Sequence, residues 1–297
     1  MSTTFAAAAA GFVRDLDEDM ARIKVLIEDA RTRGVELLAL PEAALGGYLS
    51  SLHEVGAPGD VTDVPPQLDP DGPEIAALAA LAGDMVVTAG YCERGDAASG
   101  GLPYNSCVAV TGDGVLGRHR KVHQPLHENA SYAAGDRFAA FETPVGRLGM
   151  MICYDKAFPE AARALATDGA RVVVCLSAWP ASRTDRAPVL AEDRWTRRFD
   201  LFDRARALEN QIVWVSANQA GTFGDMQLVA SAKIVDPGGE VLDTTGTEAG
   251  LAVATVDVDD AVDSARRVMG HLRDMRPQSY GPVVPGVAAA EIVAGRR

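Results

Sequence analysis

The sequence predicts an α/β fold built on a mixed β-sheet. Short apolar runs that are typical of buried strands alternate with helical patterns along the 297 residues. Two pairs of strands are joined by tight turns, at residues 111–114 and 236–239, and such hairpins make the sheet mixed rather than purely parallel. With 47% hydrophobic residues, the chain can bury a large core, so a single large α/β sandwich is possible.

The first half of the chain begins with an alanine-rich strand and a helix. Leu16, Met20, Ile23 and Ile27 recur at helical spacing behind an acidic first turn, and Gly34 provides the stop. The elements expected in this half are strands at 4–13, 35–40 and 85–91, helices at 16–34 and 74–81, and a hairpin of strands at 105–110 and 115–120. Prolines and aspartates are dense between residues 56 and 73, which indicates a long surface loop.

The second half continues the alternation. After an irregular stretch at 121–141, the expected elements are a short strand before residue 143, strands at 148–152, 171–176, 212–217 and 251–258, helices from 159 and over 194–210, and the second hairpin. We expect one domain over residues 1–280. Residues 281–297 have no core pattern, so this tail is either loose or docked on a partner subunit.

Composition excludes several classes of function. The net charge of −13, from 28 basic and 41 acidic residues, argues against nucleic acid or an anionic membrane as the main partner. The four cysteines show no CxxC spacing, which indicates a reducing compartment rather than a disulfide framework. No secretory signal and no apolar run long enough to span a membrane is recognisable. We therefore expect a cytoplasmic globular protein.

The stretch RLGMMICYDKAFPE, residues 147–160, is the centre of the functional argument. Its apolar strand ends at Cys153, and Pro159 stands where a helix would start. Open α/β sheets build their sites at the carboxyl ends of strands, so Cys153 is either a small core residue or a nucleophile. We interpret the other three cysteines as core residues: Cys92, Cys107 and Cys175.

Two more polar residues, Glu42 and Lys121, stand at predicted strand ends, and Glu128 lies seven residues after Lys121 in a loop. Together with Cys153 they offer a chemistry. A cysteine nucleophile needs a base, and the carboxylate of Glu42 could take its proton and later give it to a leaving amine. The Lys121 ammonium and the backbone N–H of Tyr154 would stabilise the oxyanion of a tetrahedral intermediate. A second carboxylate, such as Glu128, would keep that lysine charged and aimed. This set describes amide or nitrile hydrolysis through a thioester.

These residues carry a resemblance to a known family. The segments LPEAALGGY, RKVHQP and GMMICYDKAFPE resemble the three signature blocks of the nitrilase superfamily, the carbon–nitrogen hydrolases. The downstream GARVVVCLSAWP, RARALENQIVWVSAN and IVDPGGEVL are also similar, so that the resemblance covers roughly residues 10 to 280. It implies that Glu42 is the general base, Lys121 the oxyanion lysine and Cys153 the nucleophile.

The resemblance also implies an αββα sandwich whose subunits pair through helices, with a homodimer as the minimum assembly. The second glutamate of the family falls in the loop after the lysine block. Glu128 matches it best, and Asp136 and Glu142 are rivals. The alanine-rich first strand departs from the family, whose first strand usually contains more β-branched residues.

The substrate is expected to be a small amide, cleaved to a carboxylate and ammonia without a cofactor. The sequence Cys153-Tyr154-Asp155 resembles the amidase and carbamoylase branches rather than the nitrilases proper, so an N-carbamoyl compound is the second choice and a nitrile the third. Tyr48, Trp179 and Asn218 are candidate pocket residues. A substrate carboxylate would call for a cation, and the loop at 181–194 offers three: Arg183, Arg186 and Arg194. This loop either closes over the site or is simply solvated.

Three alternatives use the same residues. His119, His123 and His127 recur every four residues, as in a helical zinc site, but Pro125 and the strand pattern remove the helix. A papain-like Cys–His pair would need a histidine beside Cys153, and none of the five histidines has a suitable context. The non-enzyme alternative is a pseudo-hydrolase that serves as an interaction module. The presence of Cys, Glu and Lys together argues against it.

Overall fold

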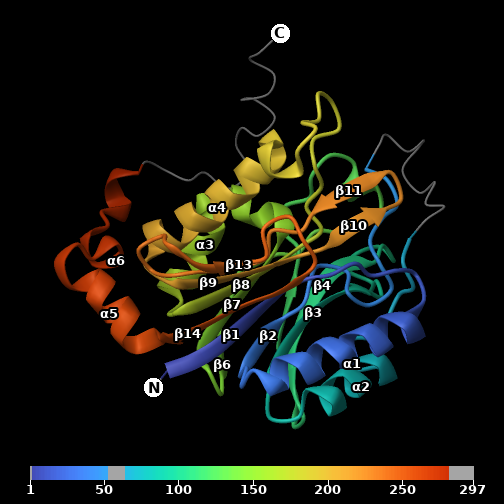
Figure 1. Ribbon diagram of the computed structural model, residues 1–297, viewed down its shortest axis with the longest axis horizontal. Coiled ribbons are helices and arrows are strands. Elements are labelled where there is room, and N and C mark those ends of the chain that lie inside the picture. Colours follow the sequence, from blue (N-terminus) through green and yellow to red (C-terminus); the bar gives the residue numbers. More distant parts are fainter. Residues whose placement is uncertain (1, 53–63, 281–297) are drawn as a thin grey trace.

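The protein has a mixed α/β fold with a large sheet between two layers of helices (Figure 1). The computed structural model describes residues 2–52 and 64–280. Within them, a 12-stranded sheet runs in the order β5-β4-β3-β2-β1-β9-β8-β7-β6, with β14 paired to β1, β12 to β9 and β13 to β12. Its main strands are β1 (Ser2–Ala9), β2 (Leu37–Ala39), β3 (Val86–Glu93), β4 (Tyr104–Thr111), β5 (Gly114–Arg120), β6 (Phe141–Thr143), β7 (Gly146–Ile152), β8 (Val172–Ser177) and β9 (Val213–Asn218).

The two ends of this sheet turn toward each other, so the sheet is nearly closed. Strand β5 contacts β6 and β7, although the two ends of the sheet are separated by the whole strand order. The remaining strands are β10 (Ala220–Phe223), β11 (Met226–Val229), β12 (Lys233–Val235), β13 (Val241–Thr244) and β14 (Gly250–Asp257). The strand order mixes parallel pairs, such as β7 with β8 and β8 with β9, with antiparallel hairpins, as expected.

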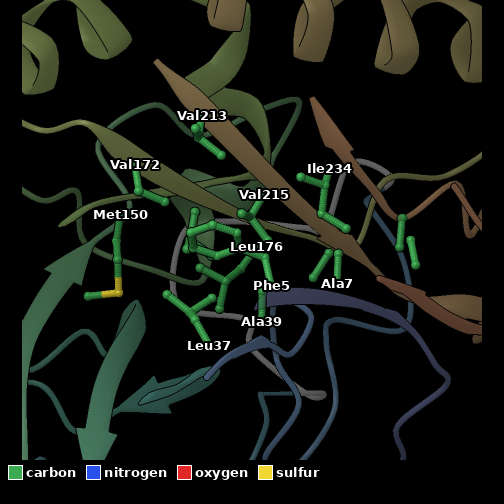
Figure 2. Close-up of a cluster of buried hydrophobic side chains, with 14 of the residues drawn as sticks. Phe5, Ala7, Leu37, Ala39, Met150, Val172, Leu176, Val213, Val215 and Ile234 are labelled. Atoms are coloured by element: carbon green, nitrogen blue, oxygen red, sulfur yellow. The ribbon is translucent and has the colours of Figure 1, made fainter. Parts of the chain in front are cut away.

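The side chains of β1 point alternately to the two faces of the sheet, and the buried interior is divided into layers on these two faces. Phe5 and Ala7 face the core between the two halves of the sheet, whereas Ala6 and Ala8 face the core beneath the first pair of helices. The central core joins residues from both halves, including Leu37 from one and Val174 from the other. Figure 2 shows part of this cluster. The alanine-rich segment is thus the expected first strand, buried on both faces.

Two pairs of helices form the outer layers. Helices α1 (Leu16–Thr32) and α2 (Pro73–Ala82) cover the first half of the sheet, and α3 (Pro159–Thr167) and α4 (Arg194–Asn210) cover the second (Figure 1). Helix α1 buries Ile23 and Ile27, and Asp15 caps it by accepting hydrogen bonds from two backbone N–H groups. This arrangement confirms the expected sandwich.

The sequence pattern missed four elements. The glycine-rich segment after β9 forms the hairpin of β10 and β11, and two helices, α5 (Val258–Val268) and α6 (His271–Asp274), follow the last strand. Short 3₁₀ helices also occur, and they are η1 (Glu128–Ala130), η2 (Cys153–Ala157), η3 (Leu190–Glu192) and η4 (Pro277–Ser279). The expected loop at 56–73 falls partly outside the described residues, and the tail at 281–297 falls wholly outside them. No described helix is long and apolar enough to cross a membrane.

Candidate active site

Four strand ends meet at one edge of the sandwich and bring the candidate residues together. Glu42 follows β2, Lys121 follows β5, Cys153 follows β7, and Ala178 follows β8. The Glu42 segment packs tightly against β3 at Gly90, where a Cβ would lie 2.4 Å from the Ala43 nitrogen and 2.7 Å from the Glu42 Cα. Only glycine permits this approach without movement of the backbone.

Lys121 lies between two carboxylates. Its Nζ donates a hydrogen bond to Glu42 Oε1 at 2.8 Å and to Glu128 Oε1 at 3.0 Å, and it lies 2.8 Å from Glu128 Oε2. All three side chains have no exposed surface. Of the rival acids, Glu142 is an exposed partner of Arg147 and Asp136 is exposed, so Glu128 is the one that reaches Lys121.

Neutral donors complete this charged cluster. Asn105 Nδ2 donates to Glu42 Oε1 and to Glu128 Oε1, both at 2.7 Å, and the Tyr48 hydroxyl donates to Glu128 Oε1 at 2.9 Å. The Ala178 N–H donates to Glu42 Oε2 at 2.6 Å. Sequence reasoning missed Asn105. The available signal was a polar residue near the start of a mostly apolar strand, β4. In the structure, the Asn105 carbonyl accepts a hydrogen bond from the Lys121 backbone N–H.

Burial and charge set the protonation of this cluster. Burial lowers the pKa of Lys121, but the Glu128 and Glu42 charges outweigh burial, and the net pKa lies well above its usual value. Burial raises the pKa of Glu128, the Glu42 charge adds to this rise, and Lys121 only partly offsets it. Lys121 therefore stays cationic, and the cluster holds two carboxyl groups around one ammonium.

Cys153 occupies the turn between β7 and η2. Its backbone φ is +49°, a left-handed conformation that is uncommon for a residue with a Cβ, and only 5% of its surface is exposed. Burial, followed by the Glu42 charge, raises the pKa of the thiol well above its usual value. Lys121, Lys156 and the Ala178 N–H pull it down, but less strongly. The resting side chain is therefore a thiol that needs a base.

The histidines near the site support the backbone of the turn after Cys153. Asp155 accepts hydrogen bonds from the Ile152 N–H at 3.1 Å and the His123 N–H at 2.8 Å. Its carboxylate also bonds with His119 Nε2 at 3.1 Å and His123 Nδ1 at 2.9 Å. Burial raises the Asp155 pKa, but these two histidines outweigh burial and hold it below its usual value.

These contacts bear on the two histidine alternatives. Within residues 2–52 and 64–280, no group of three or more His, Cys, Asp or Glu side chains could hold a metal ion. His119 and His123 bond to Asp155 rather than to Cys153. The zinc site and the papain-like pair therefore have no support in the described part of the chain.

A cavity of about 440 Å³ opens in front of Cys153. Of the candidate pocket residues, Tyr48 and Trp179 line it, as does Tyr154. Asn218 does not. Its Oδ1 accepts from the Trp179 N–H at 2.8 Å and its Nδ2 donates to the Ala230 carbonyl at 2.7 Å, so it is a fully buried support for Trp179.

The arginines expected at the mouth are engaged elsewhere. Arg183 donates to the Leu52 carbonyl, Arg186 to the Ser182 carbonyl and Gln227, and Arg194 to Thr184. None of the three lines the cavity; its charged residue is Arg198, which sequence reasoning missed.

Asp193 ties the two ends of the 181–194 loop together. It accepts from the Ser182 N–H and hydroxyl and from the Trp195 N–H, and its side chain is wholly buried. Burial raises the Asp193 pKa, but these hydrogen bonds outweigh it and lower the pKa to about 2. The loop is thus anchored at its base.

A second buried charge network lies behind the turn after Cys153. Lys156 and Lys233 donate to opposite oxygens of Asp203, at 2.7 and 2.9 Å, and Trp214 Nε1 also donates to this carboxylate at 2.9 Å. The Lys156 ammonium lies over the Phe199 ring. This network joins the turn to α4 and β12, and no sequence motif indicated it.

Comparisons with known proteins agree with this fold. Residues 5–267 match the model of the carbon-nitrogen hydrolase family, and the chain belongs to that family, within the nitrilase superfamily. It is therefore a carbon–nitrogen hydrolase enzyme of the amidase or nitrilase type.

Individual relatives include both a nitrilase and an amidase. The chain is 35% identical to a probable nitrilase of Schizosaccharomyces pombe over 71% of its own length and 74% of the relative's. It is 31% identical to an (R)-stereoselective amidase of a Pseudomonas species, over 81% and 80%. The crystal structure of a carbon-nitrogen hydrolase from Helicobacter pylori superposes with a TM-score of 0.79 at 24% identity, covering 94% of this chain and 97% of that one.

Proposed function

We propose that the protein is an amidase that hydrolyses a small amide to a carboxylate and ammonia through a thioester on Cys153. The observation that carries this proposal is the position of Lys121 between two buried carboxylates, beside a buried thiol at the floor of a cavity. A thiol with a raised pKa needs a nearby base, and Glu42 acts on that thiol electrostatically.

In the first half-reaction, Glu42 takes the thiol proton as the Cys153 sulfur attacks the carbonyl carbon of the amide. The Lys121 ammonium and the Tyr154 N–H stabilise the oxyanion that forms. Collapse of the tetrahedral intermediate breaks the C–N bond, and Glu42 returns the proton to the nitrogen, so that ammonia leaves. The product is an acyl thioester on Cys153.

In the second half-reaction, water replaces the amine. Glu42 removes a proton from water as its oxygen attacks the thioester carbonyl, and the same two donors stabilise the oxyanion. The carbon–sulfur bond then breaks, the sulfur regains a proton from Glu42, and the carboxylic acid is released. Glu128 keeps Lys121 charged and aimed throughout. Glu42, the Cys153 thiol and the attacking water account for every proton that moves, so the mechanism calls for no cofactor.

Related proteins support both the bond that is cleaved and the nucleophile. An (R)-stereoselective amidase and the omega-amidase of Bos taurus are among the relatives, and the latter is 27% identical to this chain. In a variant of the Nesterenkonia amidase, which superposes with a TM-score of 0.72, the acetamide moiety of fluoroacetamide is attached to the active-site cysteine. We extend that role to Cys153.

Ammonia release from a panel of amides, nitriles and N-carbamoyl amino acids tests the proposal. We expect release from amides, and a loss of about a thousandfold or more in Cys153→Ala. Cys175→Ala is the matched control, because Cys175 is also buried but packs in the core beneath α3 and α4, whereas the pocket residues Tyr48 and Ala178 belong to another cluster. Turnover confined to nitriles or to N-carbamoyl compounds would reassign the substrate, and undiminished release in Cys153→Ala would exclude the thiol mechanism.

We also infer that the enzyme is a cytoplasmic homodimer or a higher homo-oligomer. Apolar residues exposed on α4, Leu201 at 65% and Leu208 at 48%, support the assembly, because they lie two helical turns apart on one face.

A further inference from the structure

The cavity in front of Cys153 is graded from a buried floor to an exposed rim. Tyr48, Cys153, Ala178 and Trp179 form the floor, with at most 8% of their surface exposed. Trp195 and Phe202 are half-buried on the wall. Aliphatic and aromatic side chains thus dominate the region next to the thiol.

Such a lining selects for apolar acyl groups. The cavity offers few polar partners beyond the catalytic cluster, so a hydroxylated or charged group placed deep within it would lose its hydration without compensation. An aromatic or alkyl chain loses nothing and gains contact with Trp179, Trp195 and Phe202.

One face of α4 places the positively charged side chain of Arg198 at the rim of the same cavity. Trp195, Arg198 and Phe202 occur at spacings of three and four residues, so they project from the same side of the helix, and all three line the cavity. Arg198 is exposed, whereas the two aromatics on either side of it are half-buried.

Arg198 forms no hydrogen bond or ion pair with any residue of the described ranges. Three other arginines of α4 are engaged by the protein: Arg194 with Thr184, Arg204 with the Gly239 carbonyl, and Arg206 with the Lys156 carbonyl. Arg198 is the one charged side chain of the described residues on the cavity wall. Its guanidinium is thus available to a ligand.

We propose that the substrate is the amide of an apolar acid, aromatic by preference, whose far end carries a carboxylate that pairs with Arg198. This inference rests on the proposed amidase function and names the substrate class of that site. The amide group sits at Cys153, the apolar body lies along the aromatic wall, and the carboxylate stays at the rim. There the carboxylate keeps part of its hydration, so the ion pair costs little desolvation.

Three amides that differ only at the far end test this inference. They are 3-phenylpropanamides that carry a carboxylate, a methyl group or an aminomethyl group at the para position of the ring. The measurement is kcat/KM for ammonia release in the wild type, in Arg198→Gln and in Arg197→Gln. The last is the matched control, because Arg197 is also exposed on α4 but does not line the cavity.

We expect the wild type to prefer the carboxylate over the methyl compound by about tenfold, with the ammonium compound slowest. Arg198→Gln should abolish this order by slowing the carboxylate compound far more than the methyl compound, whereas Arg197→Gln should preserve it. Equal rates for the carboxylate and methyl compounds in the wild type, or a preference that survives in Arg198→Gln, would overturn the role of Arg198.

The result also separates this inference from the proposed function. Propanamide, which lacks the ring, is measured beside the three compounds. If it is hydrolysed but no ring compound reacts faster, the apolar substrate class is wrong and the amidase function stands. If no amide in the set releases ammonia, the amidase function itself fails.

Discussion

Cys153 combines a strained backbone with a buried thiol, and both follow from its place at the end of β7. The chain must leave the strand and enter η2 at once, which forces the positive φ. Burial and the Glu42 charge then keep the sulfur protonated. At the scale of the residue, reactivity depends on a base that acts when substrate is present, and not on a preformed thiolate.

This state of the thiol can be measured by the ultraviolet absorbance of thiolate during a pH titration. The difference between the wild type and Cys153→Ala should show no thiolate from Cys153 below pH 9, the ordinary thiol value, because the pKa is raised. A thiolate signal from Cys153 at neutral pH would contradict the account. Glu42→Gln should shift the Cys153 titration downward, since it removes a neighbouring negative charge.

The site residues that could be predicted from the sequence pattern are those that come soon after a strand. Glu42, Lys121 and Cys153 each follow an apolar run, so the sequence pattern places them at one edge of the sheet. Asn105 and Arg198 could not be found in this way. Asn105 contacts Glu42 through pairings between strands distant in the sequence, and Arg198 is one of several arginines on α4 whose directions depend on how the helix packs.

At the scale of elements, α4 and the turn after Cys153 are held together by buried charges. Asp203 on α4 is wholly buried and forms ion pairs with both Lys156 and Lys233. Helix α4 itself was predicted from residues 194–210, and it has these bounds. Helix α5 was missed although its sequence carries a helical period, with Val258, Ala261, Val262 and Ala265 at spacings of three and four residues.

Asp203→Asn should lower the free energy of unfolding by about 3–5 kcal/mol, because two buried ammonium groups lose their carboxylate. Denaturant unfolding checks this, with Asp200→Asn as the control. Asp200 also pairs with Lys233, but 42% of its side chain is exposed, so we expect a loss below about 1 kcal/mol. Equal losses in the two variants would contradict a buried network.

The difference in the free energy of unfolding between the wild type and Asp203→Asn should depend on pH in a definite direction. Burial raises the Asp203 pKa, but Lys156 and Lys233 outweigh burial and hold it below the ordinary 3.8. A carboxyl with a lowered folded-state pKa stabilises the protein above its unfolded-state pKa and loses this effect as the pH falls through the folded-state pKa. The difference in the free energy of unfolding between the two proteins should therefore be constant near neutral pH and become smaller below pH 3.8.

At the scale of the whole molecule, the nearly closed sheet and its two helical layers give three buried core layers in the described residues, and a fourth buried cluster lies at the candidate site. Alternation and hairpin turns predicted a mixed sheet. The layering came from the resemblance to a family, because no local pattern shows that the ends of a sheet will meet. The helical layer of α3 and α4 exposes apolar residues that a lone subunit would leave in water.

If α4 forms the subunit interface, Leu201→Asp should shift the molar mass measured by light scattering toward that of the monomer, 31.2 kDa. A buried charge without a partner opposes association. Val25→Asp is the control, because Val25 is 63% exposed on α1 in the opposite layer. An unchanged mass in Leu201→Asp, or dissociation in Val25→Asp alone, would place the interface elsewhere.

The central claim is that Cys153 becomes acylated and is freed again by water. Rapid quenching of the enzyme with an amide substrate, followed by intact and peptide mass spectrometry, tests this most directly. We predict a transient adduct with the mass of the amide minus ammonia, located on Cys153 and absent from Cys153→Ala. Ammonia release by the wild type without any adduct, or an adduct on another residue, would contradict the account.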